Sequence, residues 1–334
     1  MSQVRHTDAD ARQALSRLFA PIASDLALVD RRLQQELRHS DPFIDDLAQH
    51  SFRIGGKRLR PALLLLAAKA IGDVTPEHHT LAAVVEMVHT ATLVHDDVLD
   101  EAEVRRHLDT VNARWDNKTS VLLGDYLFSH AFYLASTLET TFGCRAIGES
   151  TNTVCEGELR QTNSSGNFWL SRDEYFGIID AKTAELTACC CRLGAHYAGA
   201  DGATVERLTN YGRKLGLAFQ IVDDLLDLEG EEQTTGKSLG TDLANRKMTL
   251  PLILLREQSS KADVGRLQAL YEESDGAHSG LLLDWLEESG TLEQARRAAV
   301  KFTEEVAAEL MTLPDSEAKR MLAEIARFLI ARNA

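Results

Sequence analysis

Apolar residues recur at every third or fourth position along nearly the whole chain. The pattern is plain over residues 15–33, and it returns over residues 81–93 and 208–222. A period near 3.6 residues is typical of amphipathic helices. No run of residues alternates apolar and polar side chains as a half-buried strand would. The pattern therefore predicts an all-α protein, a bundle of ten or more helices joined by short loops.

Capping residues mark several of the expected helix starts. Asp41 and Thr75 each precede a proline, which suits the first turn of a helix. Two further pairs have the spacing of a capping box: Ser171 with Glu174, and Thr291 with Gln294. These signals predict helices that begin near residues 42, 76, 172 and 292.

Two polar stretches interrupt the helical pattern, at residues 164–167 and 229–247. Gly and Ser residues in the first, and Gly residues in the second, predict loops. No long linker or low-complexity block divides the chain. We therefore expect one domain over residues 1–334 rather than two.

The composition excludes several kinds of partner and location. The chain has 36 basic and 51 acidic residues, a net charge of −15, which argues against nucleic acid or an anionic membrane surface as a partner. The longest apolar run, residues 62–68, is far below the ~20 residues that span a bilayer. The polar N-terminus does not resemble a signal peptide. Five cysteines without a Cys-x-x-Cys pair indicate reduced thiols. These features predict a cytoplasmic protein with no integral membrane segment.

Two copies of an Asp-Asp-x-x-Asp pattern stand out, at residues 96–100 and 223–227. Residues four apart share a helical face, so Asp96 and Asp100 point the same way, and the second copy repeats this arrangement. Like charges at that spacing repel, and apolar flanking residues imply partial burial, which raises the cost. Hard divalent cations with oxygen ligands would offset it. The two copies are interpreted as facing walls of one metal site in the bundle.

Basic residues also occur in blocks, and these could bind an anionic ligand of a metal held by the acidic runs. Residues 55–60 carry three cations just before an apolar helix, where the helix dipole favours negative charge. A phosphate bound there would relieve this conflict, and the two glycines would permit its close approach. The alternative is a solvated basic turn. Further basic residues follow the acidic runs or lie between them: Arg105, Arg106, Lys182, Lys237 and Lys247. Together the blocks indicate a site for metal ions and a phosphorylated ligand.

Two histidines precede the first acidic run. His89 lies two helical turns before Asp96 on roughly the same face, so it is either a packed core residue or part of the binding site. His95 directly precedes Asp96, and this pair is similar to the His-Asp pair of metal phosphohydrolases. That class of enzyme is a rival interpretation, although it leaves the acidic run at residues 223–227 unexplained.

Seven motifs in order resemble those of the trans-isoprenyl diphosphate synthases, the polyprenyl synthetase family, and in particular its long-chain, octaprenyl-type members. They cover a motif-bearing core of about residues 50–255. The matching segments are Gly55–Pro61, His89–Asp100, Arg105-Arg106, Gly124-Asp125, Lys182-Thr183, Phe219–Asp227, and Gly236-Lys237 through Lys247–Pro251. Two departures from the family pattern place His107 and Arg246 where a glycine is common.

The resemblance implies a single-domain, all-α fold around a deep central cavity, usually as a homodimer. It implies 1'-4 head-to-tail condensation of isopentenyl diphosphate with an allylic diphosphate. It also implies three Mg²⁺ ions, with the metal ligands Asp96, Asp97, Asp100, Asp223 and Asp227, and with Asp224 as a further outer ligand.

The resemblance also implies a role for each basic and polar residue of the motifs. Those expected on the allylic diphosphate are Arg105, Lys182, Lys237 and Lys247. Those expected on isopentenyl diphosphate are Lys57, Arg60, His89 and Arg106. Thr183 and Gln220 would line the reacting centre. The departed diphosphate, rather than a side chain, is the expected proton acceptor.

Small residues before Asp96 bear on the length of the product. In the family, an aromatic side chain at the position of Ala91 or Thr92 closes the pocket at short products. Both are small here, and Val88 lies a further turn back. The resemblance therefore predicts a long all-trans prenyl chain, with a farnesyl or geranylgeranyl product as the alternative. Small residues that only pack against a neighbouring helix would leave another wall to set the length.

Two other functions share parts of this pattern. A class I terpene cyclase uses the same metal and diphosphate chemistry but needs no second diphosphate site, so Lys57, Arg60 and Arg106 argue against it. A non-catalytic subunit of a two-component synthase tends to lose acidic ligands, and this chain keeps all six.

Overall fold

The computed structural model describes residues 16–54, 58–229, 241–273 and 276–331. It confirms the all-α prediction. The longer helices are α2 (Ala23–Glu36), α3 (Pro42–Ile54), α4 (Leu59–Ile71), α5 (Pro76–Leu99), α7 (Asn117–Ser136), α8 (Phe142–Ser164), α10 (Glu185–Tyr197), α11 (Gly202–Glu229), α15 (Lys261–Glu272), α16 (Gly276–Glu288), α17 (Thr291–Leu310) and α18 (Glu317–Ala331). The shorter ones are η1 (Ala20–Ile22), α6 (Val111–Arg114), α9 (Arg172–Ile179), the π-helical turn η2 (Asp180–Ala184), α13 (Thr241–Ala244) and α14 (Leu250–Gln258).

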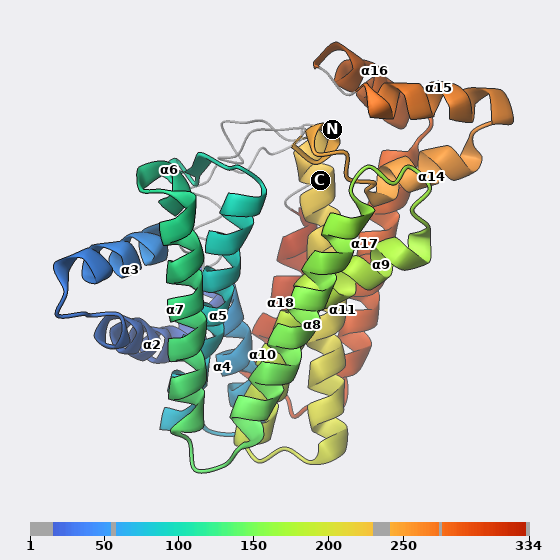
Figure 1. Cartoon of the computed structure of the whole chain (residues 1–334). Helices are drawn as coiled ribbons and strands as arrows, with labels where there is room; N and C mark the ends of the chain where they lie inside the picture. The colour runs from blue at the N-terminus through green and yellow to red at the C-terminus, as the bar shows by residue number, and fades with distance from the viewer. Residues whose placement is uncertain (1–15, 55–57, 230–240, 274–275, 332–334) are drawn as a thin grey trace.

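The long helices pack side by side in a bundle (Figure 1). α5 lies against α7, α4 and α2, while α10 lies between α4 and α11, and α11 packs on α17. α15 and α16 project from one end of the bundle, beyond α14. The carboxyl-terminal ends of α5 and α11 point to this same end. The two Asp-rich runs therefore come to one end of the molecule.

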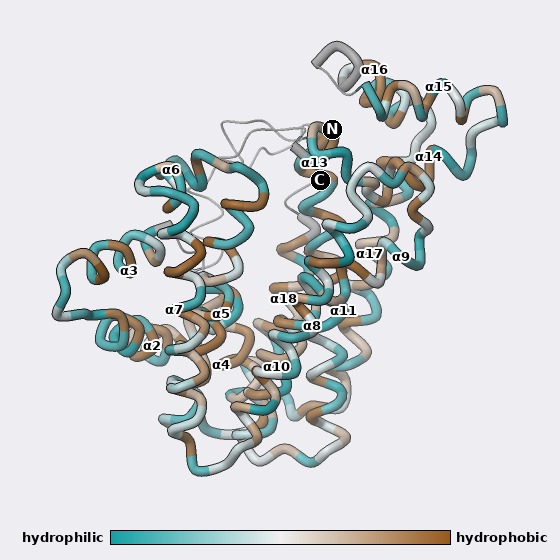
Figure 2. The backbone as a smooth tube through the Cα atoms, viewed as in Figure 1, coloured by the Kyte–Doolittle hydropathy of each residue, from teal (hydrophilic) through white to brown (hydrophobic). Residues whose placement is uncertain are grey.

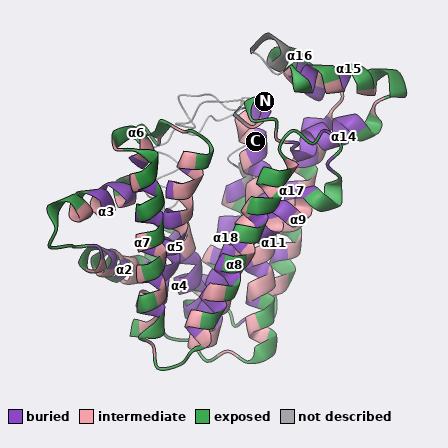
Figure 3. Cartoon of the chain, in the orientation of Figure 1, coloured by how far each residue is buried: buried purple, intermediate pink, exposed green. Residues whose placement is uncertain are grey.

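Helix α4 shows why the bundle holds together. Its sequence is apolar around most of its circumference, and the side chains from Pro61 to Ala68 are all buried. A helix that is hydrophobic on every side belongs in a core. Figure 2 shows the apolar residues along α4 and its neighbours, and Figure 3 shows α14 almost wholly in the buried colour. The buried side chains form two large clusters, one around α4, α5 and α10 and one around α14 and α17.

Most of the expected helix starts are confirmed by their hydrogen bonds. The Asp41 carboxylate accepts from the Phe43 amide at 2.8 Å at the start of α3. Ser171 and Glu174 form the predicted capping box of α9. The predicted box at Thr291 is wrong. Gly290, with a φ of 70°, occupies the cap position of α17, and the buried Thr291 hydroxyl donates to a carbonyl of the preceding helix.

A two-residue antiparallel pair, β1 (Val104–Arg105) with β2 (Leu108–Asp109), forms a tight hairpin after α5. The strands are too short to produce an alternating pattern, which is why the sequence gives no sign of them. The hairpin carries Arg105 and Arg106 and holds them beside the end of α5. In the described part of the chain, no helix is long and apolar enough to cross a bilayer.

Candidate active site

The last turn of α5 presents the first Asp-rich run. The pKa of Asp96 is raised to about 6, chiefly by burial, with Glu158 and Asp100 contributing to the rise and Lys182 opposing it. The charged carboxylate of Asp96 is therefore held in an unfavourable environment without a cation. This is the condition that a bound divalent metal would relieve.

Asp97, the second aspartate of the first Asp-rich run, points toward the hairpin. Its side chain is only 3% exposed, and its carboxylate accepts a hydrogen bond of 2.7 Å from Nε of Arg105 on the hairpin. The amide of Ala102 also closes on the Asp97 carbonyl. Sequence spacing cannot separate this carboxylate from its neighbours. The contacts favour a role in holding Arg105 over the metal-ligand role that the resemblance implied.

The second Asp-rich run lies on the last turns of α11. Asp227 accepts a hydrogen bond from the backbone amide of Asp242 at 2.9 Å. The pKa of Asp242 is raised to about 6, chiefly by burial, with Asp227 and Asp223 contributing to the rise and Lys247 opposing it. Burial also raises the pKa of Asp224 well above its ordinary value, with Asp242 adding to the effect. Four carboxylates thus crowd together at the end of α11.

Lys247 connects the two acidic walls. Its Nζ lies 3.6 Å from a carboxylate oxygen of Asp100 on α5 and 3.5 Å from one of Asp242, which itself contacts Asp227. Asp242 and Asp100 together raise the pKa of this lysine against the effect of burial. Lys247 and Asp242 thus connect the first Asp-rich run to the second, which lies 127 residues later in the sequence.

The π-helical turn η2 supplies Lys182 and Thr183. Single π-helical turns are rare and frequent at functional sites because the widened turn re-aims its side chains. Lys182 forms an ion pair with Glu158 of α8, with N and O 2.5 Å apart. A Cβ added to Gly157 would lie 2.6 Å from the Lys182 amide, so only glycine lets α8 approach this turn. Thr183 donates to the side chain of Gln220 on α11 at 2.8 Å.

A second cationic cluster lies around the start of α4. Nη1 of Arg60 lies 2.9 Å from Nε2 of His89, and both residues are half-buried. Burial and the surrounding arginines lower the pKa of His89 well below its ordinary value, so this imidazole is neutral. Arg58 forms an ion pair with the buried Glu86 at 2.6 Å and also binds Asp30. Arg106 adds a further cation to the field around His89.

A small pocket lies beside the second cationic cluster. Leu59, Arg60, Thr183 and Phe219 are among its lining residues, and its volume is about 20 Å³. The pocket thus joins the cluster around Arg60 to the η2 turn with its lysine.

Of the residues expected to set product length, Val88 and Ala91 are fully buried on α5. Thr92 is partly exposed, and its hydroxyl donates to the His89 carbonyl at 2.8 Å. Lys57 and Lys237, two further expected ligands, lie outside the described residues.

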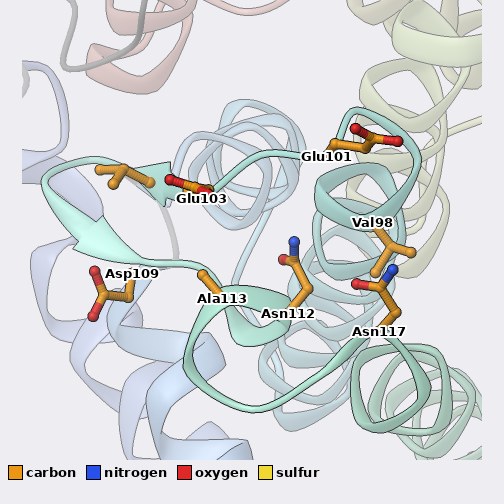
Figure 4. Close-up of a pocket in the computed structure, with 8 residues that line it drawn as sticks. Val98, Glu101, Glu103, Asp109, Asn112, Ala113 and Asn117 are labelled. Carbon is orange, nitrogen blue, oxygen red and sulfur yellow. The ribbon is translucent and has the colours of Figure 1, made fainter.

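A larger open pocket lies between the hairpin, the end of α5, α6 and the start of α7 (Figure 4). It has a cavity volume of about 620 Å³, and its polar lining includes Glu101, Glu103, Asp109 and Asn112. Among the residues that the structure describes, no lysine or arginine lines this pocket. An acidic pocket without cations repels a diphosphate, so this is not where such a ligand would bind.

Five residues other than glycine have a positive φ in the described chain, and each is a predicted site residue or lies within two positions of one in the sequence. They are Arg58, Glu101, Arg106, His107 and Arg246. Left-handed backbone is unfavourable for these residue types, and such strain clusters at functional sites. His107 and Arg246 are the two departures from the family pattern, at 64° and 50°. The backbone there is of the kind that glycine adopts freely.

The donor set fits Mg²⁺ rather than a soft transition metal. Carboxylate oxygens dominate the site, and Mg²⁺ is usually held by one or two carboxylates together with substrate phosphates and water. Among the residues that the structure describes, no three His, Cys, Asp or Glu side chains form a preformed cage.

Several residues of the site were missed by sequence reasoning. Glu158, Tyr175 and Asp242 carry no motif spacing of their own, and they reach the site only because α8, α9 and α13 fold against it. Glu86 could have been found, since it lies one turn before His89 and is a buried acid in an apolar helix.

Comparison with known proteins agrees with this geometry. Residues 41–285 match the family model described as Polyprenyl synthetase. The chain is 33% identical over 320 residues to octaprenyl diphosphate synthase of Escherichia coli strain K12, covering 96% of this chain and 99% of that one. It is likewise 33% identical to geranylgeranyl diphosphate synthase of Methanosarcina mazei, covering 92% and 99%.

A solved structure of polyprenyl synthase from Caulobacter crescentus CB15, complexed with calcium and isoprenyl diphosphate, superposes with a TM-score of 0.91. It is 35% identical and covers 96% of this chain and 98% of its own. Fold and sequence agree over nearly the full length of both chains. The chain therefore belongs to the polyprenyl synthetase family of prenyltransferases.

Proposed function

We propose that the protein condenses isopentenyl diphosphate head-to-tail, 1'-4, onto an allylic diphosphate in a Mg²⁺-dependent reaction. The single observation that carries this proposal is Lys247, which sits between Asp100 of one acidic wall and Asp242 of the other. A separate cationic cluster, with Arg60 and Arg106 around the neutral His89, would provide a second anion site. Two anion sites joined by one pocket suit a reaction between two diphosphates.

The side chains divide by the substrate that they would hold. The allylic diphosphate would lie between the carboxylate walls, where Asp96, Asp100, Asp223 and Asp227 would hold Mg²⁺. When bound, the metal stabilises negative charge on the leaving diphosphate. Lys182 and Lys247 would bind the oxygens of the same diphosphate. Lys182 would then leave its ion pair with Glu158 and pair with the substrate instead. Arg60, His89 and Arg106 would bind isopentenyl diphosphate. Fixed cations that face the leaving group stabilise charge as it develops.

We propose a positioning role for Asp97 in place of the expected metal ligation. Its carboxylate is buried, and it already accepts from Nε of Arg105. A buried carboxylate bound to an arginine holds that guanidinium in one orientation. Arg105 would then present its remaining N–H groups to the allylic diphosphate.

The rival functions fit the geometry less well. A terpene cyclase leaves the cluster around Arg60 without a ligand. A phosphohydrolase centred on His95 requires that imidazole to face the metal, but its Nε2 lies 3.0 Å from the Val121 carbonyl of α7. The His95 ring also occupies the space that a Cβ at Gly124 would need. A non-catalytic subunit does not explain why both acidic walls are complete.

We further propose a long-chain product of the octaprenyl type. The small side chains at Ala91 and Thr92 support this, since neither would block a chain that grows along α5 toward Val88. A farnesyl or geranylgeranyl product is the alternative, because relatives with long and with shorter products are equally similar to this chain.

Incubation of the pure protein with Mg²⁺, isopentenyl diphosphate and allylic primers of several lengths tests the function directly. We expect condensation with at least one primer, a ladder that ends at a long product, and loss of turnover when EDTA removes the metal. Chain length is read by chromatography of the dephosphorylated products. Absence of condensation with every primer would refute the proposal, and activity only after addition of a second protein would favour the non-catalytic subunit.

We propose that the protein is a homodimer joined through one face of α7. Val121, Leu122 and Tyr133 expose apolar surface along this helix, with Leu122 58% exposed, and Leu159 of α8 adds to it. Large apolar patches on a surface mark interaction sites. The homodimer that the family resemblance implies would cover them.

Replacement of Leu122 with Asp should convert the dimer to a monomer, because association would bury an unpaired carboxylate. Light scattering after size exclusion measures the mass. Met311, which is 75% exposed at the end of α17, provides the matched control, and Met311→Asp should remain dimeric. A wild-type monomer, or a dimeric Leu122→Asp variant, would contradict this interface.

A further inference from the structure

Four side chains from three elements form one continuous chain of hydrogen bonds beneath the site. Tyr175 of α9 donates from its hydroxyl to Oδ2 of Asp224 at 2.5 Å. Gln220, one turn before Asp224 on α11, donates from Nε2 to Oδ1 of the same carboxylate at 2.8 Å. Thr183 of η2 donates from Oγ1 to Oε1 of Gln220 at 2.8 Å. We call this series the Tyr175–Thr183 relay.

The chemistry of its members gives the relay a fixed direction. The Asp224 carboxylate accepts from both neighbours, from the Tyr175 hydroxyl and from the Gln220 amide nitrogen. This fixes the Gln220 amide, with its nitrogen toward Asp224 and its oxygen toward Thr183. The Thr183 hydroxyl then donates its hydrogen to Gln220. Toward any other group Thr183 can only accept, through a lone pair on its oxygen. Asp224 and Tyr175 are 5% and 4% exposed, so water does not compete for these bonds.

The end of the relay lies where the two substrates would meet. Thr183 lines the small pocket that Arg60 and Phe219 also line, and Lys182 precedes it on η2. The resemblance places Thr183 and Gln220 at the reacting centre. An oxygen lone pair held toward that centre favours positive charge on a nearby carbon, whereas an O–H pointing the same way opposes it. The direction of the relay therefore matters to the reaction.

Resting on the proposed function, we propose that Tyr175 and Asp224 are positioning residues that set this direction. Tyr175 fixes Asp224 as an acceptor, Asp224 orients the Gln220 amide, and Gln220 turns the Thr183 lone pair toward the carbon that becomes positively charged. On this account Asp224, the middle residue of the second acidic run, acts through hydrogen bonds rather than as an outer metal ligand. Its counterpart Asp97 likewise faces the protein, toward Arg105.

Tyr175→Phe tests the relay, since it removes one hydroxyl and leaves the ring packed. We expect kcat to fall about tenfold while KM for both substrates stays within about twofold, because the interaction acts in the transition state. In a Thr183→Val background the same change should have no further effect on kcat, since the relay no longer ends in a hydroxyl. Independent, multiplicative losses in that double variant would overturn the proposal, as would a wild-type kcat for Tyr175→Phe.

Tyr211→Phe is the matched control. Tyr211 is also fully buried, and its hydroxyl donates to the Leu322 carbonyl at 2.8 Å, away from the relay. Both variants should lose stability, measured by urea unfolding, but only Tyr175→Phe should lose kcat. An equal loss of kcat in both would reduce Tyr175 to a general structural role and overturn the proposal.

Should Tyr175→Phe fail to fold, Asp224→Asn serves in its place. It keeps the shape of the side chain but can donate to Gln220, which would reverse the amide and turn the Thr183 O–H toward the pocket. At saturating Mg²⁺ we expect at least the tenfold loss, and an unchanged kcat would overturn the proposal. Wild-type protein in the same assay separates the two levels of inference. Without wild-type condensation the proposed function fails, whereas wild-type condensation with a fully active relay variant refutes the relay alone.

Discussion

Asp96→Asn is expected to lower kcat by about 10³-fold and, at the same time, to stabilise the metal-free protein. The loss of activity follows because an amide cannot replace a charged oxygen ligand, and removal of one electrostatic group of this kind costs about 10²–10³-fold or more. The gain in stability follows because burial and Asp100 make the charged form of Asp96 unfavourable, which raises its pKa to about 6.

The pH dependence of stability fixes the sign of this second effect. The folded pKa lies above the unfolded value, so the folded state binds the proton more tightly, and the charge of Asp96 lowers stability as the pH rises from about 4 to above 6. A shift of this size corresponds to at most about 3 kcal/mol, and partial exposure of the side chain reduces it to about 1–2 kcal/mol. Urea unfolding in EDTA should show the gain at pH 7.5 and none at pH 4.

Asp284→Asn is the matched control for this variant. Asp284 is exposed on α16, away from both acidic walls. It should leave both kcat and the free energy of unfolding unchanged. An Asp96→Asn protein that keeps more than a tenth of wild-type kcat would contradict the proposed metal ligation. An Asp96→Asn protein that is less stable than wild type at pH 7.5 would contradict the claim that the charge of Asp96 destabilises the metal-free protein.

Ala91→Phe is expected to shorten the main product to the farnesyl or geranylgeranyl class. Ala91 lies five residues before Asp96 on α5, about 7–8 Å along the helix axis at a rise of 1.5 Å per residue. A phenyl ring there would close the path of a chain that grows from the metal site toward Val88. Product analysis with the wild-type primer measures the effect. Because Ala91 is fully buried, the variant should also lose about 1–3 kcal/mol of stability through overpacking.

Two further variants separate a blocked path from a disturbed core. Thr92→Phe introduces the same ring one turn from Asp96 at a partly exposed position, and it should also shorten the product. Ala299→Phe overpacks a fully buried alanine of α17 in the other apolar cluster, and it should cost stability but leave the product unchanged. A wild-type product from both α5 variants would show that another wall sets the length.

The helices could be predicted because each one buries a face, and burial imposes a 3.6-residue period that is visible in the sequence. The two acidic walls could be predicted for a related reason: Asp96 and Asp223 each end an apolar run, where a charge requires an explanation. The hairpin could not be predicted, since two residues per strand do not establish a period. The capping box at Thr291 was wrong because Gly290 provides the turn and the threonine side chain packs inward.

Much of the site's fine structure depends on contacts that spacing cannot encode. Nothing in the run at residues 96–100 shows that Asp97 faces Arg105 while its neighbours face the other wall. Glu158 becomes a partner of Lys182 only because Gly157 lets α8 approach the π-helical turn. Such residues are identified by the tertiary packing that brings distant segments together.

The left-handed residues around the site have a consequence for how it evolves. A position that needs a positive φ usually retains glycine, yet His107 and Arg246 occupy two such positions here. A residue with a Cβ has fewer backbone states in the unfolded chain than glycine has, so it loses less conformational entropy on folding, and this offsets part of the strain. The left-handed backbone in the turns that carry Arg106 and Lys247 therefore lowers net stability by less than its strain alone would. Both departures from the family pattern leave unchanged the groups that would bind the substrate.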